Sequence, residues 1–140
     1  MNSYKNLEIY QLSYKLALEV HKLTMQLPFY ELYEEGGQAR RSSKSIPSLI
    51  AEGYGRKRYK ADFLKFLYQA LGSCDETTVH LNFIKDTHHD KAQQVLQLIG
   101  EYDMLGKKIN SFSSYVDEKW QSKQPAAPVT SNKKPATSNK

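Results

Sequence analysis

The sequence is poor in cysteine and has no long apolar run and no alternating apolar pattern. It contains one cysteine, Cys74, which excludes an internal disulfide and is compatible with a reducing compartment. No apolar stretch of signal-peptide type follows Met1, and no window approaches the roughly 20 apolar residues that a membrane-spanning helix needs. Nothing alternates with a period of two over a useful length, so no sheet is expected. We expect a cytoplasmic protein with no membrane association.

Residue patterns for metal binding are also missing. The pair His88-His89 lies between Asp86 and Asp90, which at first sight suggests ligands. The spacing fits no standard ligand pattern, and a specific site needs three or four convergent ligands. A solvated turn is therefore the favoured interpretation, and no metal is expected.

The other chemically reactive groups are isolated from one another. Cys74 falls on an apolar helix stripe and is interpreted as a buried, inert thiol. His21 and His80 are lone helix histidines, expected to be structural, and Glu52 and Glu76 are expected to pair with nearby arginines. No Ser-His-Asp or Cys-His arrangement follows from spacing, and no complete glycine-rich phosphate loop occurs. The sequence therefore gives no positive case for an enzyme, a catalytic residue or a cofactor.

Apolar residues recurring at steps of three and four predict four long helices. Short links between long helices favour an antiparallel, up-and-down four-helix bundle over residues 1–120. After Trp120 the composition changes to proline, serine and lysine, which predicts a disordered basic tail over 121–140. The expected helices are at about 7–27, 34–56, 61–86 and 91–119.

The first expected helix, 7–27, carries apolar side chains on two arcs rather than one. Tyr10, Tyr14 and Leu18 fall on one arc, and Leu16 and Val20 fall on the other. An ordinary surface helix has one apolar stripe and a wider polar face. The alternative to self-association is a helix that is deeply packed within a monomer. We favour self-association, because a small bundle has little material to bury two faces of one helix.

The second expected helix contains Pro47 and ends near Gly53. A proline inside a helix removes one hydrogen bond and kinks the axis, so a kink is expected at Pro47. Gly36 and Gly37 make the start of this helix less certain. We interpret the stretch as a structural hinge formed by Ser45, Ile46, Pro47, Ile50, Ala51, Glu52 and Gly53.

Charge is segregated along the chain. The net charge is +5, yet residues 1–120 hold 16 Lys and Arg against 15 Asp and Glu. Between residues 40 and 60, seven cations accompany one acid, Glu52. Tyr54 and Tyr59 are interleaved with them. Cations supply phosphate contacts and tyrosines can stack on unpaired bases, so nucleic-acid binding is favoured over a merely solvated face. The candidate binding residues are Arg40, Arg41, Lys44, Arg56, Lys57, Arg58 and Lys60.

Two strings then identify a family. Ser45-Ile46-Pro47-x-x-Ile50-Ala51-Glu52-Gly53, followed by Phe66-Leu67-x-x-Ala70-x-Gly72-Ser73-x-x-Glu76, resembles the four helix bundle protein family, as do Pro28, Gln38 and Arg41. Its members are encoded in intervening sequences of bacterial large-subunit ribosomal RNA genes. It is related to the accessory variability determinant of diversity-generating retroelements. Leu49 departs from the asparagine that members usually carry, which weakens transfer of a specific role to this motif.

The resemblance implies a ring, typically a homopentamer. In the retroelement relatives it implies a basic surface that binds nucleic acid and also docks a reverse transcriptase. The leading hypothesis is accordingly a non-enzymatic oligomeric bundle that binds RNA or DNA. The alternative is a protein-interaction scaffold, such as an accessory subunit of a reverse transcriptase, without a direct nucleic-acid role. A small hydrolytic or metal enzyme is the third and least supported class.

Overall fold

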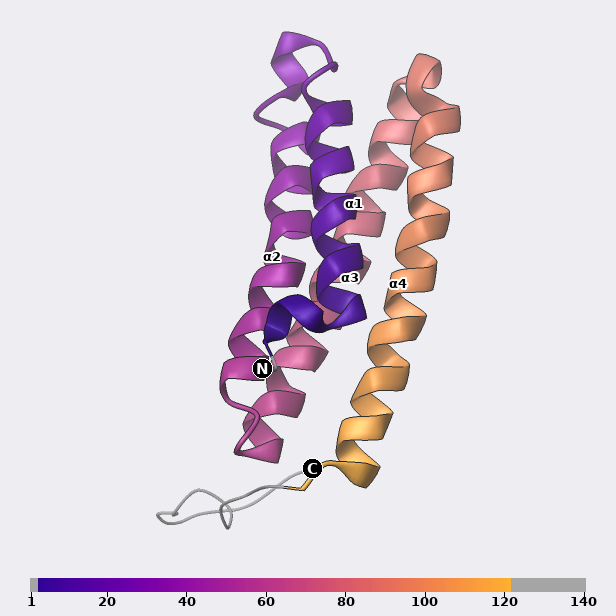
Figure 1. Cartoon of the computed structure of the whole chain (residues 1–140). Coiled ribbons are helices and arrows are strands. Elements are labelled where there is room, and N and C mark those ends of the chain that lie inside the picture. The colour runs from indigo at the N-terminus through magenta and orange to yellow at the C-terminus, as the bar shows by residue number, and fades with distance from the viewer. Residues whose placement is uncertain (1–2, 122–140) are drawn as a thin grey trace.

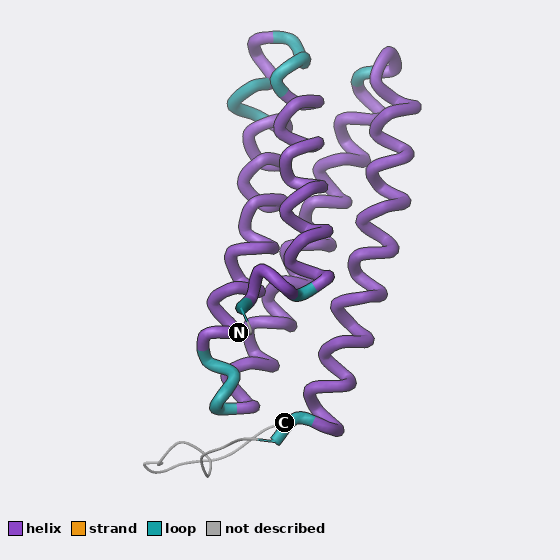
Figure 2. Tube along the Cα trace, viewed as in Figure 1, coloured by secondary structure: helices purple, strands orange, loops and turns teal. Residues whose placement is uncertain are grey.

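The computed structural model describes residues 3–121, and within them the chain is all-helical, with no strand. Figure 2 shows helix over most of the described length, with loops confined to the connections. This confirms the all-helical prediction; residues 122–140, where the tail was expected, lie outside the described part. The elements are η1 (Tyr4–Asn6), α1 (Glu8–Thr24), η2 (Phe29–Glu31), α2 (Glu35–Gly55), α3 (Lys60–Thr87), η3 (His89–Lys91) and α4 (Ala92–Lys119).

The four long helices pack side by side as a bundle (Figure 1). α3 and α4 have 28 residues each, whereas α1 has 17 and ends at Thr24 rather than at the expected Leu27. Turns over 25–27 lead into Pro28, which cannot continue a helix. The connection between α1 and α2 lies at the same end of the bundle as the connection between α3 and α4.

The core forms along the apolar stripes of all four helices. Leu16 of α1, Ile50 of α2, Leu67 of α3 and Ile109 of α4 are fully buried. Complete burial of such side chains contributes roughly 1.5–3 kcal/mol each. At the end of the bundle near the α2–α3 connection, the core becomes aromatic, because the Phe63 ring lies 5.9 Å from that of Phe112 and 5.3 Å from that of Trp120.

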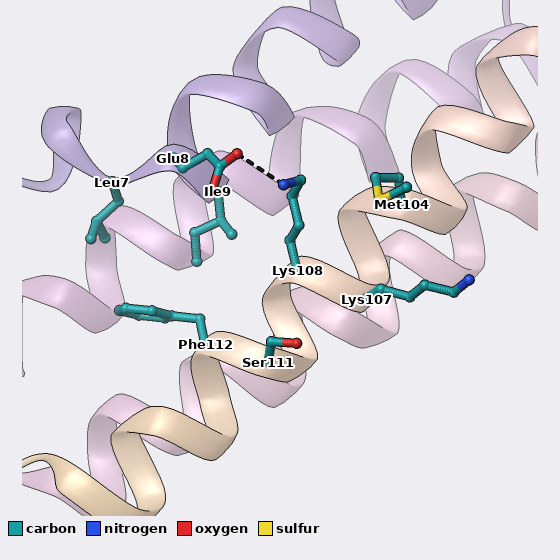
Figure 3. Close-up of a pocket in the computed structure, with 8 residues that line it drawn as sticks. All are labelled: Leu7, Glu8, Ile9, Met104, Lys107, Lys108, Ser111 and Phe112. Carbon is teal, nitrogen blue, oxygen red and sulfur yellow. Dashed lines mark hydrogen bonds and ion pairs between the residues drawn. The ribbon is translucent and has the colours of Figure 1, made fainter.

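The seam between α1 and α4 is the most open part of the bundle. It is bridged at the surface, where Lys108 Nζ contacts Glu8 Oε2 at 2.9 Å and Lys91 Nζ donates to Gln26 Oε1 at 2.9 Å. Beside the first of these contacts lies a surface pocket of about 550 Å³ (Figure 3). Apolar side chains of Leu7, Ile9 and Phe112 line it, and none of the candidate binding cations reaches it.

α2 runs through Pro47 without interruption and presents small side chains to its neighbours. Ser42 and Ser43 are buried, and the hydroxyl of Thr77 on α3 donates to Ser42 Oγ at 2.8 Å. At Gly53 the approach is closest, since a Cβ there would lie 2.8 Å from the Cβ of Phe66. Small residues on α2 therefore set the spacing between α2 and α3.

The glycine pair at the start of α2 is inside the helix rather than before it. α2 begins at Glu35, and both Gly36 and Gly37 are buried in its first turn. A Cβ on Gly36 would lie 2.8 Å from the carbonyl oxygen of Glu31, and one on Gly37 would lie 3.0 Å from that of Leu32. The pair lets the preceding chain fold back against the helix start.

Within residues 3–121, one of the two apolar arcs of α1 stays partly uncovered. Tyr14, Leu18 and Met25 are 50%, 48% and 52% exposed, whereas Leu16 and Val20 on the other arc are fully buried. The described part of a single chain therefore buries one face of this helix and leaves apolar side chains of the other face at the surface.

The close contact at Gly53 yields a stability prediction. We expect Gly53→Ala to lower the free energy of unfolding by about 1–3 kcal/mol, because the new methyl group would push α2 away from α3. Gly72→Ala is the matched control: its Cβ meets nothing within 4 Å, so better helix propensity should stabilise the protein by about 0.5–1 kcal/mol. Urea unfolding followed by circular dichroism measures both, and equal effects would contradict the assignment of a packing role to Gly53.

Candidate nucleic-acid interface

The seven candidate cations fall into two groups, one in the N-terminal half of α2 and one at and beyond its C-terminal end. The N-terminal cation group comprises Arg40, Arg41 and Lys44, and the C-terminal cation group comprises Arg56, Lys57, Arg58 and Lys60. Twelve helical residues at 1.5 Å each place Lys44 and Arg56 about 18 Å apart along the axis. The cluster that is dense in sequence is thus divided in space. Ser48 and Glu52 are the exposed side chains between the two groups on that side of α2.

Arg40 is committed to internal contacts. Its Nη2 donates to the carbonyl of Leu32 at 2.6 Å, and its Nη1 donates to Thr24 Oγ1 at 3.0 Å. Thr24 is fully buried, and its hydroxyl donates a hydrogen bond to the carbonyl of Val20 at 2.8 Å. The guanidinium therefore ties the end of α1 and the α1–α2 connection to α2, which gives this predicted binding residue a structural task.

Arg41 and Lys44 are the exposed members of the N-terminal cation group. Lys44 Nζ lies 3.0 Å from His21 Nδ1 on α1. With Arg40 and Tyr33, the two cations line a surface pocket of about 360 Å³, completed by Leu32 and Gly37. This end of α2 offers positive charge around a shallow hollow, which is suited to an anionic group.

The C-terminal cation group rests partly on aromatic rings. The Arg56 guanidinium lies 5.2 Å from the Phe66 ring centroid, and Lys57 Nζ lies 3.9 Å from that of Tyr54. Lys60 Nζ donates to the carbonyl of Asp117 at 2.8 Å, whereas Arg58 is exposed in the turn. The indole N–H of Trp120 donates to the Lys57 carbonyl at 3.0 Å, which fixes the turn against the end of α4.

The predicted stacking role of Tyr54 is wrong. Tyr54 is 9% exposed, and its ring packs 6.1 Å from that of Phe63. Its position at i+4 from Ile50 and i+8 from Ile46 places it on the buried side of α2, a periodicity that the sequence already contained. Tyr59 is half-buried at the start of α3.

The structure places a different aromatic ring beside the cations, that of Tyr33 on the α1–α2 connection. Phe29, Tyr30 and Tyr33, here called the aromatic tip, are 77%, 68% and 78% exposed on the α1–α2 connection. Sequence reasoning missed them, although three aromatic residues within five positions directly after Pro28 lie outside any helical apolar stripe. Tyr33 belongs to the same pocket as Arg41 and Lys44.

The histidines at this end make acid contacts that sequence reasoning also missed. His88 is 8% exposed rather than part of a solvated turn, and its Nε2 lies 2.6 Å from the carboxylate of Glu31. His80 lies 2.7 Å from Glu35 and 3.4 Å from Glu76, so Glu76 pairs with a histidine and not with an arginine. Among the described residues, no three His, Cys, Asp or Glu side chains gather as a metal site requires.

Cys74 is the one thiol in the chain, and its surroundings suppress its reactivity. It is 3% exposed between α3 and α4, and its Sγ donates to the carbonyl of Tyr102 at 3.4 Å. Burial, with smaller contributions from Asp75 and Asp103, raises the pKa of the thiol from 9.0 to about 12. Because the thiolate is the nucleophile, a thiol that stays protonated is a poor catalyst.

A comparison with family models decides the relationship that the motif strings suggested. Residues 5–111 match the model described as 23S rRNA-intervening sequence protein. The chain belongs to the 23S rRNA-intervening sequence protein family. The resemblance drawn from the sequence is thereby confirmed. No curated protein matches the chain.

All seven candidate cations and the aromatic tip lie within the part of the chain that matches the family model. Trp120, which braces the C-terminal cation group, lies beyond it. Within residues 3–121 of this family member, no helix is long and apolar enough to cross a membrane.

The two neighbouring arginines of the N-terminal cation group are expected to respond differently to mutation. Arg40→Gln should lower the free energy of unfolding by about 1–3 kcal/mol, because the Thr24 hydroxyl and Leu32 carbonyl lose a charged donor. Arg41→Gln removes the same charge from an exposed position and should change stability by less than about 0.5 kcal/mol. Chemical unfolding of the two variants side by side tests the assignment, which equal losses would refute.

Proposed function

We propose that this family member is a non-enzymatic, oligomeric helical bundle that binds RNA or DNA through the two cation groups of α2. One observation carries the proposal: Arg41, Lys44 and Arg56 are exposed along one side of α2, with Arg58 beyond its end and Glu52 as the only acid among them. Steps of three and four residues keep side chains on one side of a helix. The arrangement forms a stripe rather than a compact patch.

A stripe of this kind supports binding of the phosphate backbone. Each cation that neutralises a phosphate releases condensed counterions, so the affinity falls as salt rises. Since the N-terminal and C-terminal cation groups lie about 18 Å apart along α2, they would contact phosphates several nucleotides apart on one strand. Arg40 contributes to the local positive charge while its guanidinium stays bound to Leu32 and Thr24.

Self-association supports the same function. The exposed apolar face of α1, formed by Tyr14, Leu18 and Met25, is the surface we assign to a second copy. Family resemblance suggests a homopentamer. In such an assembly each subunit repeats the cation stripe, so weak individual contacts become multivalent.

We further infer that neighbouring helices run antiparallel, in up-and-down order, and that α2 bends at Pro47. The antiparallel order is supported by contacts whose residue numbers rise on one helix as they fall on the next. Cys74 contacts the carbonyl of Tyr102, for example, while Lys60 contacts that of Asp117. The bend is supported by the missing N–H of Pro47, which leaves the helix one hydrogen bond short.

The alternative function is a protein-interaction scaffold, such as an accessory subunit of a reverse transcriptase. The observation in its favour is the apolar exposure on the outer helices. On α3, Tyr68, Val79 and Phe83 are each about half exposed, and on α4 Leu96 and Met104 are similarly exposed. Exposed apolar side chains of this kind can contribute to surfaces that bind other proteins where they lie together. A complex that survives nuclease and high salt would favour this function.

Charge reversal on the cation stripe tests nucleic-acid binding. The variant Arg41→Glu/Lys44→Glu/Arg58→Glu should bind a labelled RNA or DNA at least tenfold more weakly at low salt, because favourable phosphate contacts become repulsive. The slope of log affinity against log salt should also become shallower, since fewer counterions are released. Fluorescence anisotropy over a salt series measures both quantities.

The matched control places one of the same substitutions on another helix. Lys107→Glu alters an exposed lysine on α4, away from α2, and should weaken binding by less than a single reversal on the stripe, Lys44→Glu. Equal affinity of the triple variant and the wild-type protein would reject the proposed interface.

Leu18→Glu tests the assembly. A charge at the centre of the exposed α1 face should lower the mass observed by sedimentation equilibrium, while the circular dichroism spectrum stays unchanged because Leu18 is outside the core. Lys15→Glu, at an exposed position on the same helix, is the control and should assemble normally. A wild-type protein that sediments as a monomer would refute self-association altogether.

A further inference from the structure

The aromatic tip exposes three aromatic side chains on a single short connection. Phe29, Tyr30 and Tyr33 are each at least 68% exposed, and the rings of Phe29 and Tyr33 meet edge to face with centroids 6.2 Å apart. A hydrophobic ring gains free energy when it leaves water, so grouped exposed rings mark a binding surface more often than a structural one.

The backbone beneath these rings is held firmly. The Leu32 carbonyl accepts from Arg40, and the Glu31 carboxylate contacts His88 and also accepts the backbone N–H of Glu35 at 3.2 Å. Gly36 brings the start of α2 so close to the Glu31 carbonyl that a Cβ would not fit. The rings thus project from a braced connection, which reduces the entropy that binding would otherwise cost.

Positive charge lies directly beside the aromatic tip. Tyr33, Arg41 and Lys44 line one pocket, in which Arg40 is also present. Of the acids in the connection, Glu31 contacts His88 and Glu35 contacts His80, which leaves Glu34 as the exposed carboxylate next to Tyr33. One ring, that of Tyr33, and the cations in one shallow hollow match the two parts of a nucleotide, its base and its phosphate.

We propose that the aromatic tip binds unpaired bases, with Tyr33 stacking on a base while Arg41 and Lys44 contact the flanking phosphates. This inference rests on the proposed function and narrows its ligand to single-stranded nucleic acid. Base–aromatic stacking requires an exposed π-face, and a paired duplex presents such faces only at its ends. A strand with unpaired bases supplies both the faces and the phosphates.

A second copy of the chain is the less favourable occupant. A twofold, isologous contact through the aromatic tip would bring Arg41 and Lys44 of one protomer against the same residues of the other, and for the heterologous contacts of a ring we have assigned the exposed face of α1. Like charges placed together in this way oppose association. A polyanion gains from the same cations, so charge complementarity selects nucleic acid over self-association at this end of the bundle.

Three labelled ligands and four variants of the full-length chain test the proposal. The ligands are a 12-nucleotide RNA without self-complementarity, the DNA of the same sequence, and the duplex of that DNA. Tyr33→Ala should weaken single-strand binding roughly five- to a hundredfold, the range expected for loss of one stacked base. Tyr33→Phe keeps the π-face and should retain most of the affinity. Tyr68→Ala removes a half-exposed tyrosine from α3 and should bind like the wild-type protein.

The fourth variant separates charge from stacking. Glu34→Gln removes the exposed acid beside the pocket, so its affinity for the single strands should equal or exceed that of the wild-type protein. On the duplex, Tyr33→Ala should bind with the same affinity as the wild-type protein. Similar losses on single strand and duplex would overturn the stacking role, as would single-strand affinity that Tyr33→Ala leaves unchanged. A lower sedimentation mass for Tyr33→Ala would overturn it too, by showing that another copy covers the tip. Wild-type protein that binds none of the three ligands would instead reject nucleic-acid binding as a whole.

Discussion

The bundle depends on how closely α2 can approach α3. Small side chains at Ser42 and Gly53 replace the large apolar residues that helices usually present to one another, and the contact at Gly53 leaves no room for a methyl group. The distance between two helix axes depends on the side chains at the contact, so α2 and α3 pack closely. Because α2 is fixed in this way, its outward side is fixed as well, and that side carries the exposed cations.

Periodicity in the sequence was enough to predict the helices, because each is long and its apolar residues recur over several turns. The family strings were equally informative, since Pro47 and Gly53 of the first string are buried on α2, where it packs against its neighbours. The contacts of single side chains were harder to foresee. Arg40 and His88 have partners 8 and 57 residues away in the chain, and no local pattern encodes such pairs. Tyr54 is different, since its spacing from Ile50 already indicated burial.

Sequence proximity also misrepresented the charged surface. Seven cations within 21 positions suggest one dense patch, but the twelve helical residues from Lys44 to Arg56 separate the two groups by about 18 Å along the axis of α2. In the structure the exposed cations form a stripe rather than a patch, and the Arg40 guanidinium is hydrogen-bonded to Leu32 and Thr24. The tyrosines interleaved with the cations in the sequence, Tyr54 and Tyr59, are buried or half-buried, whereas Tyr33 of the α1–α2 connection lies beside Arg41 and Lys44.

The contact between Glu31 and His88 joins two connections that are distant in the chain but lie at one end of the bundle. Proteins open locally in cooperative units, and buried contacts between segments define which segments open together. Slow amide protons around η2 and around the α3–α4 connection should therefore exchange with similar protection. We expect the end of the bundle that carries the aromatic rings to open as one cooperative unit, although its two halves are encoded far apart.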